Sequence, residues 1–529
     1  MPIRMVNDDP NQDPRDDENS NDNNNDGGNS GRREAGGGGL GNIFMFLPMV
    51  FGLFKQFPKF TMFVVLIGAF MYFKGCGMMS GGGDTSFIGD GGPGRGAEFK
   101  QEEYDKADVF EPLDSDPSKT PLPDQISLMR FAPKRLNQGQ QGSCVGWGSA
   151  YAARTILESA STGQNPDQLS FSPAFLYNQI GLQGCQGSYI NKAMEYMQKQ
   201  GSLPFREFPY DDRDCGTQPD GQQVQRASTY RMRGYTRLTD DAGDYHVNFN
   251  AIKQNLAAGA PVVFGMNVTK SFTNDMMGRK FWQPSQQDYA GMNSLGGHCM
   301  CLVGYDDNLQ AFQIMNSWGN EWGENGVGWV KYKDFMHFTQ EAYGVAPMAK
   351  KDGSENTLAC NIGLVDASNK RYIPLTTGVG NLFKTISPVA KGTKFKMEVK
   401  NSAECFVYIF GQETDNSSYV LFPYTKKHSP FCAITGVRTF PRKESLQADA
   451  VGNKDFMAII VTKQAIDFNR MNQAINSSRA ATYQGKVNEA CAQMAIQGVR
   501  FASQGGVIQF SSQANQNQAV AMVVEIDKK

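Results

Sequence analysis

Hydrophobic and polar positions follow several different patterns along this chain, and the first pattern is the near absence of apolar side chains in residues 1–41. These residues are rich in Asn, Asp and Gly and carry nine acidic against four basic side chains. A segment of this composition cannot bury enough apolar surface to offset the conformational entropy lost on folding. We therefore expect residues 1–41 to be a disordered tail.

The composition inverts in residues 42–74, where two strongly apolar runs follow each other. They span Ile43–Phe54 and Phe60–Phe73 and are separated by a short polar stretch. Each run is shorter than the roughly 20 residues of a membrane-spanning helix, but residues 57–73 come close if the Lys59 ammonium extends to the membrane surface. The pattern predicts one transmembrane helix that anchors the chain.

The charges around this segment indicate its direction. Lys55 and Lys59 precede the span, with Arg32 and Arg33 further upstream, and only Lys74 follows it closely. The positive-inside rule then favours a cytoplasmic N-terminus and a chain that continues on the outer side of a membrane, which we interpret as a bacterial inner membrane. The two short runs also fit a pair of half-spans or an interfacial hairpin that returns the chain to the cytoplasm. Both topologies stay open.

Residues 75–121 are rich in Gly, Asp and Pro, which predicts a flexible linker. From residue 122 to about residue 350 the pattern is that of a folded domain. Helical periodicity comes first, at 149–159 and 189–199, and short apolar runs typical of strands follow, at 261–268, 299–305, 312–315 and 328–332. A helical part followed by a sheet part predicts an α+β domain over residues 122–350.

Residues 356–529 show a third pattern, in which short β-type runs are separated by turns rich in Asn, Gly and Asp. Examples are CFVYIFGQE, YVLFPYT and FMAIIVTK. The pattern predicts a separate all-β, sandwich-like domain. It resembles an uncharacterised bacterial domain that is attached to peptidases and kinases, and we expect it to bind a protein partner.

The composition of all 529 residues narrows the classes of function. The formal net charge is −2, so the chain has no overall basic field and nucleic acid is not indicated as a partner. Ten cysteines in a chain of this length do not make a disulfide scaffold. The sequence has no zinc-ligand spacing and no phosphate-binding loop, so we expect neither a metal nor a cofactor.

A candidate nucleophile stands where a Gly-rich stretch runs into a predicted helix. Cys144 follows Gly139 and Gly142, and Gln138 stands six residues before the cysteine. The free N–H groups and the positive end of a helix dipole stabilise an anion at such a position. They favour the thiolate, which is the nucleophilic form of cysteine.

Two downstream blocks carry groups that could activate this thiol. His298 stands on an apolar run predicted as a strand, and Asn316 lies in the block IMNSWGNEWGENG. A thiol, a base and an amide that orients the base are the three parts of an activated cysteine nucleophile. We therefore interpret Cys144, His298 and Asn316 as a catalytic triad.

These blocks resemble those of the papain family of cysteine peptidases, over residues 122–350. The resemblance implies that Cys144 is the nucleophile, that His298 is its acid and base, and that Asn316 orients the imidazole. Gln138 would supply the side chain of the oxyanion hole.

The resemblance also implies a papain-like two-lobed fold, with a cleft between a helical lobe and a β-barrel-like lobe. Gly187, Ser188, Trp318 and Trp322 would contact the substrate in this cleft. Trp318 would also shield the hydrogen bond between the triad asparagine and histidine.

Cys185 and Cys215 look like disulfide cysteines of the family, but their usual partners are missing. Gln141 stands where the family commonly has one of those partners. The two cysteines either pair with each other, in an oxidising compartment, or remain as buried free thiols.

The resemblance implies an endopeptidase that hydrolyses peptide bonds in a protein or peptide substrate. A thiol acyltransferase or peptide ligase would use the same triad, and an inactive membrane-tethered binding scaffold would use only the fold. Papain-family zymogens usually carry a long helical propeptide, and the linker at 75–121 is too short and too rich in Gly to be that element. The sequence therefore does not predict how activity is regulated.

Overall fold

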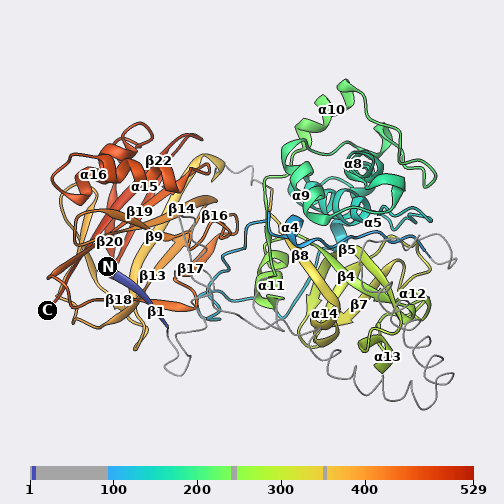
Figure 1. The fold of residues 1–529 in the computed structure, drawn as a ribbon, viewed down its shortest axis with the longest axis horizontal. Coiled ribbons are helices and arrows are strands. Elements are labelled where there is room, and N and C mark those ends of the chain that lie inside the picture. The colour runs from blue at the N-terminus through green and yellow to red at the C-terminus, as the bar shows by residue number, and fades with distance from the viewer. Residues whose placement is uncertain (1–2, 8–92, 240–246, 349–353) are drawn as a thin grey trace, which may run out of the picture. The chain divides into compact units, whose positions relative to one another are not determined.

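The computed structural model describes residues 3–7, 93–239, 247–348 and 354–529 (Figure 1). The predicted membrane anchor at 57–73, most of the predicted tail and the first part of the predicted linker lie outside these residues. Among the residues that are described, no helix combines the length and the apolar character needed to cross a membrane.

Residues 3–7 correct the expectation that the whole N-terminal tail is disordered. They form strand β1 (Ile3–Asn7), which pairs antiparallel with β18 (Glu444–Ala448). Ile3 is buried in this pair, and the Tyr419 hydroxyl donates to the Ile3 carbonyl oxygen over 2.8 Å. Ile3 and Met5 alternate with Arg4, which is the pattern of a short strand with one buried face. The polar composition of the surrounding residues concealed this pattern.

The first half of the α+β domain is helical (Figure 1). Its central helix runs without a break from Cys144 to Thr162, and therefore begins five residues before the predicted start at Ser149. The helical elements of this half are η3 (Met129–Phe131), α5 (Cys144–Gly146), the π-helical η4 (Trp147–Arg154), α6 (Thr155–Thr162), α7 (Pro166–Leu169), α8 (Pro173–Ile180), η5 (Gln183–Cys185), α9 (Ile190–Lys199), η6 (Phe205–Glu207), α10 (Gly221–Ala227) and η7 (Ser228–Tyr230).

The predicted helical periodicity at 189–199 corresponds to α9. Ile190, Ala193, Met194 and Met197 are all buried, at the spacing of one helix face. α8 begins with the two signals expected of a helix start. Ser172 caps it by accepting from the Phe175 N–H, and a proline follows at the first helical position.

The second half of the domain is an antiparallel seven-stranded sheet in the order β3-β8-β4-β5-β6-β7, with β2 paired to β5. The four predicted strands correspond to β4, β5, β6 and β7, although β5 is much longer than predicted. The elements are β2 (Gln125–Ser127), β3 (Tyr235–Arg237), α11 (Phe249–Ala257), β4 (Val262–Thr269), α12 (Lys270–Asn274), α13 (Gln286–Tyr289), β5 (Ser294–Asp306), β6 (Ala311–Met315), β7 (Val327–Lys331), α14 (Tyr332–Phe338) and β8 (Thr339–Val345).

The C-terminal domain, residues 354–529, is built mainly of strands in two sheets. One has the order β1-β18-β13-β9-β21-β20, with β10 and β17 paired at its side, and the other has the order β11-β12-β22-β19-β14-β15, with β16 paired to β14. The elements are η8 (Ser354–Asn356), β9 (Thr357–Asp366), β10 (Tyr372–Ile373), β11 (Leu375–Thr377), β12 (Leu382–Thr385), β13 (Lys394–Asn401), β14 (Cys405–Gln412), β15 (Ser418–Phe422), β16 (Phe431–Cys432), β17 (Gly436–Phe440), β18, β19 (Lys454–Thr462), α15 (Phe468–Ser477), α16 (Tyr483–Cys491), β20 (Phe501–Gln504), β21 (Val507–Gln513) and β22 (Ala519–Asp527).

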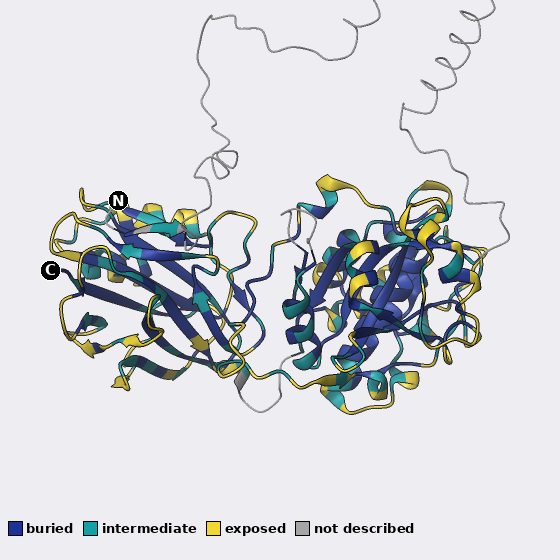
Figure 2. Cartoon of the chain, turned by 90° about the horizontal axis from the view of Figure 1, so that it is seen from below, coloured by how far each residue is buried: buried dark blue, intermediate teal, exposed yellow. Residues whose placement is uncertain are grey.

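The alternation of side chains along β14 explains how this domain packs. Val407 and Ile409 belong to a buried cluster with residues of both sheets, so the two sheets pack face to face. Tyr408 and Phe410 point to the opposite face, where they pack with buried residues of α15 and α16. In Figure 2 the buried residues accordingly follow the strands of both domains.

The described part of the predicted flexible linker is packed against the folded domains. Residues 93–98, which we call the cleft segment, hydrogen-bond to the α+β domain. Residues 99–121, which we call the connector, contain α4 (Gln101–Tyr104) and bond to both domains. The two glycines of the described part, Gly94 and Gly96, lie where backbones approach each other closely, as described below.

Candidate active site

Cys144 is the first residue of the central helix and is completely buried. Its sulfur accepts a hydrogen bond from the backbone N–H of Cys299, with 3.4 Å between Sγ and N. Cys299 follows His298 on β5. The start of the central helix and strand β5 therefore bring the thiol and the imidazole into the same site, although 154 residues separate them in the sequence.

His298 is held by Asn316, which follows β6. The distance between His298 Nε2 and Asn316 Oδ1 is 2.8 Å, and the Ser317 N–H donates to the same oxygen over 2.7 Å. Because this oxygen accepts from both, the proton of the neutral ring resides on Nε2. The basic nitrogen is then Nδ1, which is buried and makes no hydrogen bond within the described residues.

Trp318 covers this hydrogen bond. Its ring stacks on the His298 ring with the centroids 4.2 Å apart and an angle of 22° between the planes. The indole N–H donates to the Gly94 carbonyl oxygen over 3.0 Å. Trp318 thus contacts both the histidine and the cleft segment.

Gln138 is buried, and its side-chain amide is fixed in orientation. Its Nε2 donates to the Gln141 carbonyl oxygen over 2.9 Å, and its Oε1 accepts from the Ser317 hydroxyl over 2.6 Å. A side-chain amide carries two N–H groups, so the bond to Gln141 uses one and leaves the other for a substrate oxygen.

The four residues predicted to contact substrate fall into two groups. Gly187, Ser188 and Trp318 all touch the cleft segment. Trp322 is fully buried, and its indole N–H donates to the Phe272 carbonyl oxygen. Its contact with substrate stays a prediction.

The cleft segment is the part of the site that the sequence reasoning missed. Ser188 N–H donates to the Gly96 carbonyl oxygen over 2.9 Å, and Glu98 N–H donates to the Ser188 carbonyl oxygen over 3.0 Å. On the side of the sheet, the N–H groups of Gly96 and Ala97 approach the Gly297 carbonyl oxygen at 3.3 and 3.2 Å. The segment therefore bonds to both sides of the cleft.

The glycines of the cleft segment fit a space that has no room for a side chain. A Cβ on Gly94 would lie 2.4 Å from the Gln141 carbonyl oxygen. A Cβ on Gly96, which has φ of 135°, would lie 2.3 Å from the Gly142 carbonyl oxygen. The alternation of glycines at 94 and 96 was the available sequence signal, because glycine permits such backbone contact.

Burial shifts the pKa values of both members of the candidate pair toward their neutral forms. It raises the pKa of the Cys144 thiol to about 12. It also lowers the pKa of His298 to about 3, and the positive charge of Arg95 in the cleft segment acts in the same direction. The closed site therefore favours a neutral thiol and a neutral imidazole over a thiolate–imidazolium pair.

Two further features complete the surroundings of the site. Cys185 and Cys215 form a disulfide bond with 5.9 Å between their Cα atoms, which is the first of the two alternatives for this pair. No cluster of three or more His, Cys, Asp or Glu side chains suited to a metal ion occurs in the part of the chain that the structure describes.

Comparison with known proteins matches this region to one family. The family model described as papain family cysteine protease matches residues 130–348. An uncharacterized peptidase C1-like protein of Acanthamoeba polyphaga mimivirus is 28% identical over 218 residues, which are 40% of this chain and 68% of the relative. Cathepsin K of Gallus gallus is 29% identical over 198 residues, which are 36% of this chain and 52% of the relative.

A solved structure of a cysteine protease also aligns with this chain. Xylellain, a cysteine protease from Xylella fastidiosa, aligns with a TM-score of 0.41 and 25% sequence identity. The alignment covers 49% of this chain and 97% of that chain.

Proposed function

We propose that residues 130–348, which match the papain family cysteine protease model, hydrolyse peptide bonds with Cys144 as the nucleophile. The observation that carries the proposal is the bond between His298 Nε2 and Asn316 Oδ1, which leaves Nδ1 as the basic nitrogen on the residue that precedes Cys299, whose N–H donates to the Cys144 sulfur. This arrangement fits acid–base catalysis on a cysteine nucleophile.

The proposed reaction proceeds in two stages. When the cleft opens, His298 takes the thiol proton, and the helix N-terminus stabilises the Cys144 thiolate that attacks the peptide carbonyl. The Gln138 amide and the Cys144 backbone N–H donate to the oxyanion. His298 then protonates the leaving amine, and water hydrolyses the acyl-enzyme with the same histidine as its base.

A fluorogenic peptide library tests this function. Turnover is measured with the full chain and with Gly96→Val, in which the cleft segment cannot occupy its position, each beside a version that carries Cys144→Ser. We expect the open variant to hydrolyse peptides and both Ser versions to be inactive. Equal turnover with and without the thiol, or no turnover by any variant, contradicts the proposal.

Membrane association is a second part of the proposal and rests on the apolar pattern of residues 42–74. The pairing of β1 with β18 supports the hairpin alternative over a single crossing. A single crossing between residues 7 and 93 would leave β1 and the C-terminal domain on opposite sides of the membrane, where they could not pair.

Labelling from one side of a membrane tests this topology. Single cysteines at residue 8 and at residue 163 are introduced into the full chain in vesicles, and a membrane-impermeant maleimide is added outside. The hairpin predicts that both positions are labelled together or protected together. Labelling of one position alone would establish a single crossing and exclude the hairpin.

A further inference from the structure

We propose that the C-terminal domain regulates the protease by holding the cleft segment across its catalytic site. This inference rests on the proposed peptidase function and extends it to the control of the same site. It follows from the path of the connector, which leaves the cleft at residue 99 and then bonds to the C-terminal domain.

The first part of the connector is fixed on the protease domain. The Tyr104 hydroxyl donates to the Thr239 hydroxyl over 2.8 Å. The guanidinium of Arg237, a buried residue of β3, lies over the Tyr104 ring at 4.0 Å from its centroid. These contacts hold the connector six residues beyond the end of the cleft segment.

At Val109 the connector bonds to both domains. On one side, Arg237 N–H donates to the Asp108 carbonyl oxygen over 2.8 Å, and Phe110 N–H donates to the Arg237 carbonyl oxygen over 3.0 Å. On the other side, Val109 N–H donates to the Lys427 carbonyl oxygen over 2.6 Å. The Val109 carbonyl oxygen in turn accepts from Ser429 N–H over 2.9 Å. The connector therefore acts as a short strand between β3 and the C-terminal domain.

Further along, the connector lies against β17, next to the buried Arg438. Arg438 Nε donates to the Glu111 carbonyl oxygen over 3.0 Å, and Asp114 N–H donates to the Val437 carbonyl oxygen over 2.7 Å. The Leu113 side chain packs against Gly436, where an added Cβ would lie 2.9 Å from its methyl carbons. The buried Arg438 guanidinium therefore holds the connector against β17 through a main-chain oxygen.

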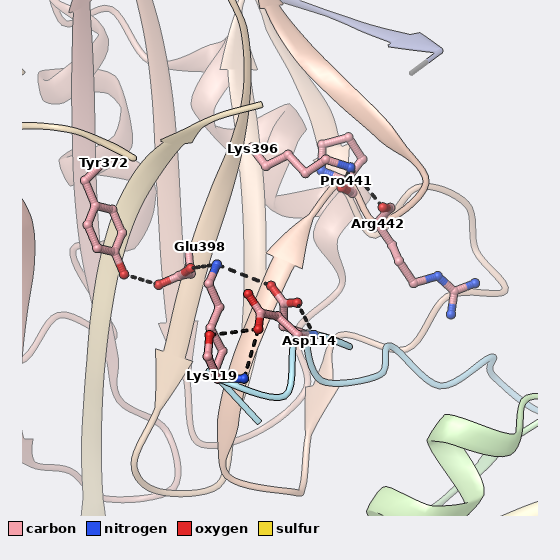
Figure 3. A network of polar contacts seen from close by, with 9 residues as sticks. Asp114, Lys119, Tyr372, Lys396, Glu398, Pro441 and Arg442 are labelled. Atoms are coloured by element: carbon pink, nitrogen blue, oxygen red, sulfur yellow. Dashed lines mark hydrogen bonds and ion pairs between the residues drawn. The ribbon is translucent and has the colours of Figure 1, made fainter. Parts of the chain in front are cut away.

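An ion pair completes the contact, and Figure 3 shows it. Lys119 of the connector lies 2.6 Å from the Glu398 carboxylate on β13 and 3.5 Å from Asp114. The Tyr372 hydroxyl donates to the other oxygen of Glu398 and fixes the carboxylate. Since Glu398 is largely buried, this pair is screened less by solvent than a surface pair.

These contacts explain how a distant domain can close the cleft. Anchoring the connector keeps the cleft segment close to its site, so the segment rebinds as an intramolecular ligand at high effective concentration. Release of the connector from β17 removes that advantage and lets substrate compete. A protein partner that binds the β17 edge in place of the connector would therefore activate the protease.

Two sets of variants of the full chain test this regulation of the protease. In the first set, Gly96→Val and Gly94→Val displace the cleft segment, and Gly221→Val is the matched control, because Gly221 has no left-handed φ and a Cβ there has no atom within 4 Å. We expect peptide hydrolysis to rise at least about ten-fold in the first two and to stay unchanged in the control, since activity follows the fraction of open molecules.

In the second set, the ion pair between connector and C-terminal domain is reversed. Lys119→Glu sets a carboxylate against Glu398 and Asp114, and we expect hydrolysis to rise about three-fold, which is the size of effect that a partly exposed ion pair supports. The double variant Lys119→Glu/Glu398→Lys restores an opposite-charge pair and is expected to return hydrolysis toward the wild-type rate.

Alkylation of Cys144 by iodoacetamide, with thermal unfolding of every variant, separates the outcomes. If displacing the segment speeds alkylation but no variant cleaves peptides, the regulation stands and the proposed function fails. If the wild-type protein hydrolyses peptide as fast as Gly96→Val, and its Cys144 is alkylated as fast, the closed cleft is refuted. If only the glycine variants respond, and Lys119→Glu does not, control by the C-terminal domain is refuted.

Discussion

The indole of Trp318 stacks on the imidazole of His298 and, through its N–H, holds the Gly94 carbonyl oxygen of the cleft segment. One side chain therefore supports the candidate catalytic base and also stabilises the segment that blocks it. The two roles can be separated, because only the second requires the N–H.

Trp318→Phe is expected to raise the peptidase activity of the full chain by about five-fold. Phenylalanine keeps an aromatic ring beside His298 but loses the hydrogen bond to Gly94, whose net contribution is about 1 kcal/mol. The measurement is kcat/KM on a fluorogenic peptide. In the Gly96→Val background the same substitution should give no rise, and a rise there would show that the effect does not pass through the cleft segment.

Asn316→Ala is expected to lower kcat on the order of 10²-fold, because His298 loses the acceptor that fixes its ring and its proton on Nε2. KM should change little, since the asparagine side chain is buried beneath Trp318 and substrate does not reach it. Steady-state kinetics in the Gly96→Val background checks this. A rise in KM with unchanged kcat would contradict the assigned role.

The reactivity of Cys144 should depend on pH differently in the closed and open proteins. Burial raises its pKa to about 12, so the closed protein holds almost no thiolate at pH 7. Its alkylation rate should still be increasing at pH 10. In Gly96→Val, water and the helix N-terminus stabilise the anion, so alkylation should level off at a lower pH. Matching pH profiles for the two proteins would refute the link between burial and latency.

Glu341→Gln is expected to stabilise the protein above pH 7. Burial on β8 raises the pKa of Glu341 to about 7, and its Oε2 accepts from the Tyr343 hydroxyl over 2.6 Å. A raised pKa means that the folded state holds the proton more tightly. The contribution of Glu341 to wild-type stability is therefore fully present below pH 4 and is lost as the pH rises through 7.

The glutamine variant lacks this ionisation and keeps an amide oxygen as acceptor. Its advantage at pH 8 should be about 2–3 kcal/mol in the free energy of unfolding, and it should vanish near pH 4. Denaturant unfolding at the two pH values measures it. An equal difference at both would mean that the substitution acts through packing instead of charge.

The residues of the candidate triad were predictable because their chemistry leaves local marks. Cys144 stands where glycines run into a helix, His298 stands on the run that forms β5, and Asn316 follows the apolar run that forms β6. The helical half of the domain follows from helical periodicity, as α9 shows, and the sheet half follows from short apolar runs, as β4 shows. β1 was not predicted, because a five-residue strand depends on a partner far away in the sequence.

The sequence by itself determined the candidate nucleophile, the candidate base and the candidate orienting amide, since each needs a particular functional group in a particular local setting. Tertiary structure decided whether the site is open. Glycines at 94 and 96 suggest flexibility when they are seen alone, and only the distances to Gln141 and Gly142 show that they serve close backbone contact. The same holds for Lys119 and Glu398, which are 279 positions apart: no local pattern encodes a pair formed when two domains meet on one connector.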